Sequence, residues 1–284
     1  MNFIELLKVN LKIASLYLQG YQVETSDFRR SYKYLASSYD DEWFVYLSSI
    51  TEDVLSKISD QKPKYILDLG CGTGGATLKL KYMFPEAKII GMDCSKHMLR
   101  QARPKLGSDS VILFRDTMER GLTKLSDNQF DLITCAWSLG YARHKKVYKE
   151  LYRVLSKNGY LLTLTNKRDT LKAVQKTMKY TMYNHYKSLK KLPLHKFPEN
   201  KEYLLKKFGK RFKEIDYGEG NFSIDLTNKQ SILDWLLNTG ILAGYEYVLD
   251  LKNDKKCRKT FEDYIKSNFK DVTHEYMWIL LQKQ

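Results

Sequence analysis

The sequence predicts an α/β fold in which helices cover both faces of a mostly parallel sheet. From Tyr65 to Thr165, short apolar runs alternate with helix-like segments. Strands that alternate with helices indicate βαβ units, and the parallel sheet built from such units is covered on both faces. Two further strand-like segments follow later in the chain, so we expect seven strands. The predicted strands are 65–68, 87–93, 111–116, 130–136, 159–165, 212–225 and 275–281.

The chain before the first strand is predicted to be helical. Leu7, Leu11 and Leu18 recur at helical spacing, and a second apolar series of the same period runs from Phe28 to Leu47. No strand pattern precedes residue 60. We therefore expect an N-terminal helical cap ahead of the sheet.

The segment from Lys167 to Arg211 interrupts the alternation of strands and helices. It is rich in lysine and tyrosine, and its pattern indicates a helical insertion after the fifth strand. Neither an internal repeat nor a low-complexity linker separates the parts of the chain, so we expect one unit. The expected segments are 1–60, the N-terminal helical cap; 61–168, the core; 169–211, the helical lid; and 212–284, the end of the core sheet.

Length and composition exclude several classes of protein. The chain has 284 residues, 43% of them hydrophobic, which suits one large globular domain or a core with an added lobe. Glu5, Lys8 and Lys12 interrupt the apolar N-terminal stretch, which argues against a signal peptide. No window approaches the roughly 18 consecutive apolar residues that span a bilayer. We expect a cytoplasmic protein without a membrane partner.

Cysteine and histidine show no metal-binding pattern. The four cysteines have no CxxC spacing and are expected to be reduced thiols, and the five histidines are scattered, whereas zinc needs clustered ligands. The cysteines are Cys71, Cys94, Cys135 and Cys257, and the histidines are His97, His144, His185, His195 and His274.

The formal net charge of +15 suggests polyanionic partners, because clustered lysine and arginine release counterions from phosphates. The excess is mostly lysine, in a chain also rich in tyrosine and asparagine and poor in proline. AT-rich coding sequence produces that composition without selection for binding. The net charge therefore gives only minor support to nucleic acid as a binding partner.

A glycine loop follows the first predicted strand. Gly70, Gly72 and Gly75 satisfy G-x-G-x-x-G, and Asp93 lies at nearly the distance at which dinucleotide-binding proteins place a ribose-binding acid. On this pattern alone, an NAD-dependent oxidoreductase stays open.

Three features favour S-adenosylmethionine (SAM) over a dinucleotide. Asp68 stands two residues before the first glycine, where a carboxylate repels a pyrophosphate but attracts the ammonium group of a methionine moiety. Asp116 ends the third strand, where its side chain can accept from an adenine amino group. No second mononucleotide-binding half is evident.

The order of these motifs resembles that of class I SAM-dependent methyltransferases, over roughly residues 28–284. This resemblance implies a Rossmann-like, seven-stranded sheet whose last strand is antiparallel. In the predicted turn before strand five, Lys157-Asn158-Gly159 stands where the family usually has Pro-Gly-Gly. The matching motifs are Asp68-Leu69-Gly70-Cys71-Gly72-Thr73-Gly74, Asp93, Asp116-Thr117-Met118, Phe130-Asp131-Leu132 and the helix-turn at 150–160.

The resemblance also implies roles for single residues. The glycines let the backbone approach the methionine part, which Asp68 helps to hold, while Asp93 takes the ribose hydroxyls. Cys94 and Met98 would flank the adenine, and Asp116 with Thr117 would bind its edge, with a solvated loop acid as the alternative for Asp116. The implied SAM-binding residues are Tyr39, Asp68, Gly70, Cys71, Gly72, Gly74, Asp93, Cys94, Met98, Asp116, Thr117, Ala136 and Trp137.

The segment from Ser31 to Asp40 resembles the N-terminal helix of small-molecule members, such as those that act on trans-aconitate or carrier-bound malonyl groups. There this helix closes over SAM, so Tyr39 is expected to touch the cofactor, with helix packing as the alternative. The end of strand four faces the methyl group in this family. Trp137 and Tyr141 therefore either shape that site or pack in the core.

The methyl acceptor is less constrained. The family's Asn/Asp-Pro-Pro-aromatic tetrad, typical of enzymes acting on base amines, is replaced by Ala136-Trp137-Ser138-Leu139. The basic, tyrosine-rich lid favours a small anionic or carrier-bound acceptor, but it equally fits an ordinary solvated helical face. Tyr34, Tyr141, Tyr183 and His185 are the candidate substrate residues, with His185 a candidate base or an inert surface histidine.

We therefore expect O- or N-methylation of a small molecule by in-line displacement, with S-adenosylhomocysteine (SAH) as the product. The sequence identifies no catalytic base. A hydroxyl acceptor benefits from one, whereas an aligned carboxylate needs none at neutral pH. Three alternatives stay open. They are an RNA or protein methyltransferase that uses the basic lid, the NAD-dependent oxidoreductase, and a non-catalytic SAM-binding protein.

Overall fold

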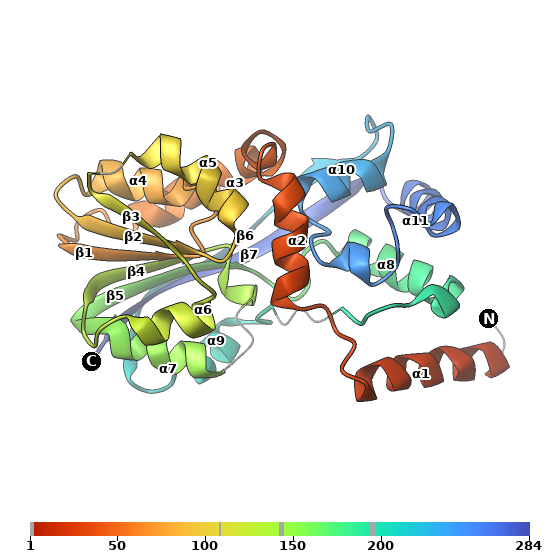
Figure 1. The fold of residues 1–284 in the computed structure, drawn as a ribbon, viewed down its shortest axis with the longest axis horizontal. Coiled ribbons are helices and arrows are strands. Elements are labelled where there is room, and N and C mark those ends of the chain that lie inside the picture. Colours follow the sequence, from red (N-terminus) through yellow and green to blue (C-terminus); the bar gives the residue numbers. More distant parts are fainter. Residues whose placement is uncertain (1–2, 108, 142–144, 194–196) are drawn as a thin grey trace. The chain divides into compact units, whose positions relative to one another are not determined.

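A seven-stranded sheet is the centre of the fold (Figure 1). The computed structural model describes residues 3–107, 109–141, 145–193 and 197–284. The strand order is β3-β2-β1-β4-β5-β7-β6. Neighbouring strands from β3 to β5 are parallel, and β7 is antiparallel to β5, which confirms the predicted Rossmann-like sheet and its antiparallel last strand. The strands are β1 (Tyr65–Leu69), β2 (Lys88–Asp93), β3 (Val111–Arg115), β4 (Phe130–Ala136), β5 (Leu155–Asn166), β6 (Phe212–Asp225) and β7 (Asp271–Lys283).

Helices precede the first strand and fill most connections between strands. The described α-helices are α1 (Phe3–Leu18), α2 (Thr25–Leu35), α3 (Val45–Ser56), α4 (Gly75–Met83), α5 (Lys96–Leu106), α6 (Met118–Gly121), α7 (Lys145–Val154), α8 (Lys172–Asn184), α9 (Lys201–Phe208), α10 (Ile232–Thr239) and α11 (Lys255–Asn268). A π-helical turn, η1 (Asp40–Phe44), precedes α3. The 3₁₀ turns are η2 (Leu122–Lys124), η3 (Leu139–Tyr141), η4 (Tyr186–Ser188) and η5 (Tyr245–Tyr247).

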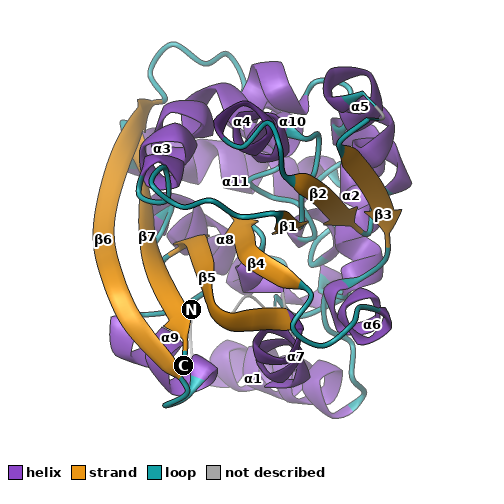
Figure 2. Cartoon of the chain, turned by 90° about the vertical axis from the view of Figure 1, so that its left-hand side faces the viewer, coloured by secondary structure: helices purple, strands orange, loops and turns teal. Residues whose placement is uncertain are grey.

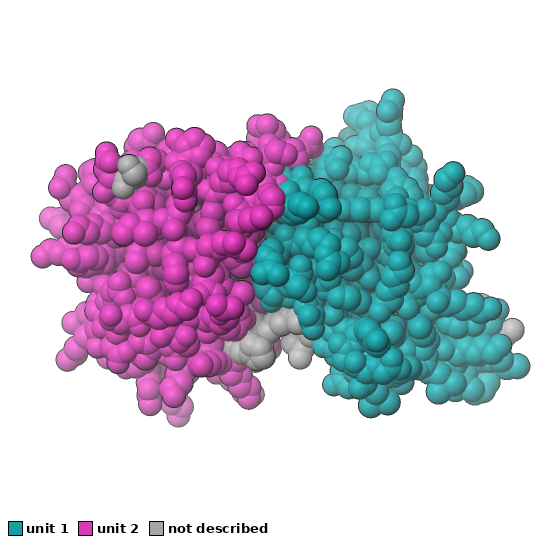
Figure 3. Space-filling model, in the orientation of Figure 1, with its two compact units in different colours: residues 1–35, 170–195, 221–274 teal, residues 36–169, 196–220, 275–284 magenta. Residues whose placement is uncertain are grey.

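The chain divides into two compact units, where we expected one (Figure 3). The first comprises 1–35, 170–195 and 221–274, and the second 36–169, 196–220 and 275–284. Strands β6 and β7 each contribute residues to both units, a continuity that apolar periodicity does not reveal. The boundaries also differ from those of the predicted cap, core, lid and sheet end, because the predicted lid is shared between the two units.

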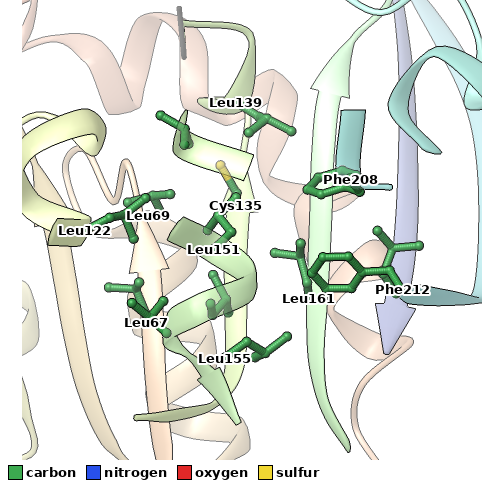
Figure 4. Close-up of a cluster of buried hydrophobic side chains, with 14 of the residues drawn as sticks. Leu67, Leu69, Leu122, Cys135, Leu139, Leu151, Leu155, Leu161, Phe208 and Phe212 are labelled. Atoms are coloured by element: carbon green, nitrogen blue, oxygen red, sulfur yellow. The ribbon is translucent and has the colours of Figure 1, made fainter. Parts of the chain in front are cut away.

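The sheet in the second unit is covered on both faces (Figure 2). Successive residues of a strand point to opposite faces, so Ile66 and Leu67 of β1 enter different cores. Ile66 packs with apolar side chains of α3, α4 and α5. Leu67 packs with those of α7 and α9, including Leu151 and Phe208 (Figure 4). Helix α9, in the predicted lid, is therefore part of the core that supports the sheet.

The first unit contains α1, α2, α8, α10 and α11. Helix α8 packs against α11, where Tyr180 stacks on Tyr264 with ring centroids 4.0 Å apart. The predicted N-terminal helix is confirmed, but its apolar series does not face a core. Leu7, Leu11 and Leu18 are 50%, 60% and 84% exposed, whereas Val9 and Leu16 are the buried residues of α1.

The prediction of a turn at Lys157-Asn158-Gly159, before strand five, is wrong. Helix α7 ends at Val154 and β5 begins at Leu155, so Lys157-Asn158-Gly159 lies within the strand. Asn158 has φ +63°, and the register with β4 shifts at this point, which accommodates the extra residues as an irregularity of the strand.

A core substitution tests this packing. Leu67 is fully buried, so Leu67→Ala is expected to lower the free energy of unfolding by about 2–5 kcal/mol through lost burial and a residual cavity. The matched control is Ile112→Ala, because Ile112 on β3 is 64% exposed and should cost no more than about 0.5 kcal/mol. Urea denaturation measures both values. Equal losses would contradict the assigned core.

Candidate cofactor site

The candidate site lies where β1, β2 and β3 end, in the second unit. The carboxyl ends of adjacent parallel strands meet at one edge of the sheet, and ligands of open α/β sheets bind there. The backbone nitrogen of Asp116 donates to the carbonyl of Asp93 at 3.2 Å, which joins the ends of β3 and β2. The β1–α4 loop joins the same edge, because the amides of Gly70 and Cys71 both donate to the carbonyl oxygen of Met92, at 2.7 and 3.0 Å.

The glycines of this loop are required by its conformation. Gly70, Gly72 and Gly74 have φ of +79°, +55° and +85°, a region that side chains disfavour. A Cβ on Gly70 would stand 2.3 Å from the Cβ of Ser138. At Gly72, by contrast, a Cβ would meet no atom within 4 Å. The loop is thus packed against the segment that follows β4 at Gly70 and is open at Gly72.

Asp68 is buried beneath the loop, with 1% of its surface exposed. Its carboxylate accepts hydrogen bonds from the hydroxyls of Thr77, at 2.6 Å, and Thr134, at 3.0 Å. Burial raises the pKa of this carboxyl to about 6, and the two hydrogen bonds only partly oppose that rise. The negative charge of ionised Asp68 therefore lies under the loop and can attract a cationic group of a ligand bound on the loop.

Asp93, at the end of β2, ties the loop to helix α5. Its carboxylate accepts from the amides of Gly72, at 3.0 Å, and Ser95, at 2.7 Å. Ser95 caps α5 by accepting from the amide of Met98 at 3.4 Å. Burial raises the pKa of Asp93 against the opposing effect of its amide donors. The half-buried Cys94 and the buried Met98 flank this connection.

Asp116 is 9% exposed and is not the solvated loop acid of the alternative interpretation. It accepts from the amide of Thr117 at 2.9 Å and from Lys124 Nζ at 2.5 Å, while Arg120 Nε lies 3.5 Å away. Burial opposes ionisation, but these donors outweigh it and lower the pKa of Asp116. Thr117 caps the short helix α6.

Tyr39 is held next to the loop by the π-helical turn that follows it. Asp40 accepts from the hydroxyl of Thr73 at 2.6 Å, and Lys105 donates to both Asp40 and the carbonyl of Thr73. Burial, then the proximity of Tyr141, Asp40 and Asp93, raises the pKa of Tyr39, so its hydroxyl stays protonated. The structure thus brings Tyr39 and Tyr141 together near Asp93.

Trp137, after the end of β4, packs inside the second unit. It has φ +61°, and its indole nitrogen donates to the hydroxyl of Thr51 at 3.0 Å. Its ring meets Tyr276 of β7 edge-on at 5.8 Å between centroids. These contacts favour the core-packing interpretation of its indole, while Ala136 and the backbone of Trp137 remain at the end of β4. The role of both residues toward a cofactor stays a prediction.

Sequence reasoning missed the residues that brace the loop. Ser138 is buried, and its hydroxyl donates to the carbonyl of Leu69 at 2.6 Å and lies 3.1 Å from the sulfur of Cys135. Ser138 stands in segment 136–141 between the large aromatic residues Trp137 and Tyr141, and its own residue type gives no sign of the contact with the loop. Thr77, two residues after Gly75, was also visible as a polar residue on an otherwise apolar helix start.

The remaining candidate residues lie in the first unit. His185 Nε2 is 2.7 Å from the hydroxyl of Thr260, Lys179 lies over the ring of Tyr183, and Tyr34 is 63% exposed. Their substrate roles stay predictions, as do the cofactor contacts of Cys71, Cys94 and the other implied residues. His144 and His195 lie outside the described residues. Within those residues, no group of three or more His, Cys, Asp or Glu side chains is arranged to hold a metal ion.

Comparison with known proteins agrees with this geometry. Residues 66–159 match the methyltransferase domain family. Over 118 residues the chain is 37% identical to the malonyl-[acyl-carrier protein] O-methyltransferase of Legionella pneumophila, and over 109 residues it is 32% identical to the trans-aconitate 2-methyltransferase of an Acidovorax species. The matched part of the chain, residues 66–159, is a methyltransferase domain of the class I SAM-dependent type.

These methyltransferase matches are confined to part of each protein. They cover 40% and 38% of this chain, and the chain spans about two fifths of the length of either relative, 40% and 41%. The fold likeness extends further. A proposed methyltransferase structure from Bacillus halodurans, 16% identical, aligns with a TM-score of 0.59 over 83% of this chain and 99% of its own length.

The open position at Gly72 gives a test of where the cofactor lies. Because a Cβ there meets no protein atom, Gly72→Val is expected to fold with only the strain of a positive φ, about 1–2 kcal/mol, yet to show no measurable binding of SAH. Gly209→Val is the matched control, since Gly209 also has positive φ and open surroundings but lies at the end of α9. Calorimetric titration of both variants is the measurement. Unchanged affinity in Gly72→Val would show that the loop is misplaced.

The raised pKa of Asp68 predicts a pH dependence. An ionised Asp68 attracts the ammonium of a methionine moiety, so the affinity for SAH should fall as the pH drops below about 6, approaching about tenfold per pH unit. Asp68→Asn should bind weakly and lose this dependence. Asp131→Asn, altered at the opposite end of β1 where Asp131 accepts from the amides of Lys64 and Tyr65, should keep it.

The same shift has an opposite effect on folding. Because the pKa in the folded state lies above the unfolded value of 3.8, the folded state binds the extra proton, and the stability contributed by this group rises as the pH falls from about 6 toward 3.8. Weaker binding at low pH therefore cannot be attributed to unfolding through Asp68. If Asp68→Asn retains the full pH dependence, another group carries it.

Proposed function

We propose that this protein transfers the methyl group of SAM to a small anionic acceptor. The observation that carries the proposal is the arrangement of three buried or half-buried acids, Asp68, Asp93 and Asp116, around one glycine loop at the carboxyl edge of the sheet. A dinucleotide would bring a pyrophosphate to this loop, directly above the charge of Asp68. A methionine moiety brings an ammonium group instead, which that charge attracts.

The fit of SAM to these residues follows from their hydrogen-bonding capacity. The carboxylates of Asp93 and Asp116 each have acceptor capacity beyond the bonds they already make, as the ribose hydroxyls and the adenine amino group require. Met98 and Cys94 supply a polarisable, partly apolar surface suited to an adenine ring. The glycine loop, open at Gly72, would receive the methionine part.

The contribution of the protein to the reaction is alignment. SAM, when bound, supplies a methyl group on a positively charged sulfur that leaves as a neutral thioether, so the chain has to position the acceptor and exclude water. The protonated hydroxyl of Tyr39 can donate a hydrogen bond but cannot serve as a base. An acceptor that is already ionised, such as a carboxylate, meets this site without a base.

An anionic acceptor is also supported by charge and by the relatives. Segment 170–195 contains lysines and no aspartate or glutamate, and Lys172, Lys176 and Lys179 are exposed on α8. The named relatives act on a carrier-bound malonyl group and on trans-aconitate. O-methylation of a carboxylate is the reaction these features favour, with N-methylation as the other outcome of the assay below.

The cofactor is tested by thermal stabilisation. SAH that binds only the folded state should raise the melting temperature with increasing concentration, while NAD should leave it unchanged. Asp93→Ala, which removes the proposed ribose acceptor and the bond to Gly72, should lose most of the shift. Stabilisation by NAD but not by SAH would overturn the proposal.

Methyl transfer is tested separately, with SAM carrying a labelled methyl group and a panel of small di- and tricarboxylates, acyl-carrier thioesters, amines and RNA. Label should appear in a carboxylate as a base-labile ester. Tyr39→Phe should reduce the rate while leaving SAH affinity within about tenfold. Transfer to RNA alone, or cofactor binding without transfer to any class, would contradict the small-molecule assignment.

A further inference from the structure

Helix α1 carries an apolar face that the rest of the first unit leaves uncovered. Its exposed apolar side chains are Phe3, Ile4, Leu7, Leu11, Tyr17 and Leu18, each between 50% and 84% exposed. Single exposed apolar residues are ordinary on a protein surface, but a contiguous apolar face marks a site of interaction.

The helix is divided into three stripes. At about 100° per residue, Phe3, Leu7, Leu11 and Leu18 fall within about 80° of one another. Val9, Ile13 and Leu16 form a second stripe, of which Val9 and Leu16 are buried. Lys8, Lys12 and Glu5 lie together on the third stripe, which is polar. A helix with these three stripes packs against the protein by its buried stripe and meets water with its polar stripe. Its exposed apolar stripe is available to contact another apolar surface.

Basic side chains border this helix. Val9 and Ile13 of α1 line a cavity of about 310 Å³ together with Met178, Lys179 and Met182 of α8. Lys179 is one of three exposed lysines at helical spacing on α8, with Lys172 and Lys176. Lys8 and Lys12 of α1 lie on the stripe next to the uncovered apolar face, whereas Lys179 of α8 lines the cavity on the packed side of the same helix.

We propose that α1 binds in the plane of an anionic membrane surface, with its exposed leucines and Phe3 entering the acyl boundary and the flanking lysines contacting lipid phosphates. An interfacial helix combines an apolar face with lysines on its polar side, and its affinity sums the buried apolar area and attraction to anionic lipid. A second copy of the chain is disfavoured as the occupant, because it would bring Lys8 and Lys12 of the two copies of α1 against each other.

This contact is peripheral. None of the described helices is both long and apolar enough to cross a membrane. The proposal departs from the sequence-based expectation of no membrane partner, which considered only spanning segments and a signal peptide. It does not rest on the proposed methyl transfer, because its readout is binding to lipid.

Vesicle co-sedimentation tests the proposal with the full chain. Vesicles of equal parts phosphatidylcholine and phosphatidylglycerol should bind the protein, and phosphatidylcholine alone should bind it much more weakly. Leu7→Gln with Leu11→Gln should weaken binding to the mixed vesicles at least about tenfold, because both side chains lose their transfer into the acyl boundary. Both residues are exposed, so folding should be unaffected.

The matched control is Val45→Gln with Ile112→Gln, which removes two apolar residues of similar exposure, 59% and 64%, from the second unit. It should bind vesicles like the unaltered chain. Lys8→Gln with Lys12→Gln should reduce the preference for phosphatidylglycerol. The proposal is overturned if the protein does not bind the mixed vesicles, or if the leucine double variant and the control double variant lose the same amount of vesicle binding. It is also overturned if light scattering shows a dimer that Leu7→Gln with Leu11→Gln converts to a monomer.

Discussion

The burial of the Asp68 carboxylate at the end of β1 is the constraint on which the candidate site depends. A carboxylate removed from water needs compensating hydrogen bonds, and the hydroxyls of Thr77 and Thr134 supply them from α4 and β4. These two bonds fix the end of β1 relative to the start of the helix that follows the loop. The intervening residues must then turn within a short distance, which their positive φ angles allow.

The loop is held from three directions in the second unit. From β2, the carbonyl of Met92 and the carboxylate of Asp93 accept hydrogen bonds from backbone amides of the loop. From beyond β4, Ser138 fills the space that a side chain on Gly70 would need. The third contact is the Tyr39–Phe44 segment, where Asp40 bonds Thr73. A loop fixed by strands and a helix start is preorganised, so little entropy is lost when a ligand binds it.

Much of the sheet and of the loop could be predicted from the sequence because both leave local patterns. Apolar runs of strand length marked all the strands except β6, whose segment is largely polar, and the spacing of Gly70, Gly72 and Gly74 with Asp68 marked the loop. The braces are tertiary contacts and leave no such pattern. Ser138 lies 68 residues after Gly70, and neither its size nor its polarity indicates that it meets that glycine.

Other differences have equally physical reasons. The spacing of Leu7, Leu11 and Leu18 correctly indicated a helix, but periodicity shows that one face is apolar and not what covers it. Trp137 lies in the left-handed region of φ, a conformation set by its bond to Thr51 and its packing on Tyr276 and unexpected for a bulky residue. The apolar pattern suggested one continuous core and gave no sign of two units, to both of which β6 and β7 contribute residues.

Hydrogen–deuterium exchange with and without SAH is the most direct measurement of the central claim that the acids at the ends of β1, β2 and β3 surround the cofactor. Binding should protect amides in 68–75, in 91–98 and in 115–118, and leave α9 and the amino end of β1 unchanged. Protection confined to other segments, or exchange at the loop that does not respond to saturating SAH, would contradict the account.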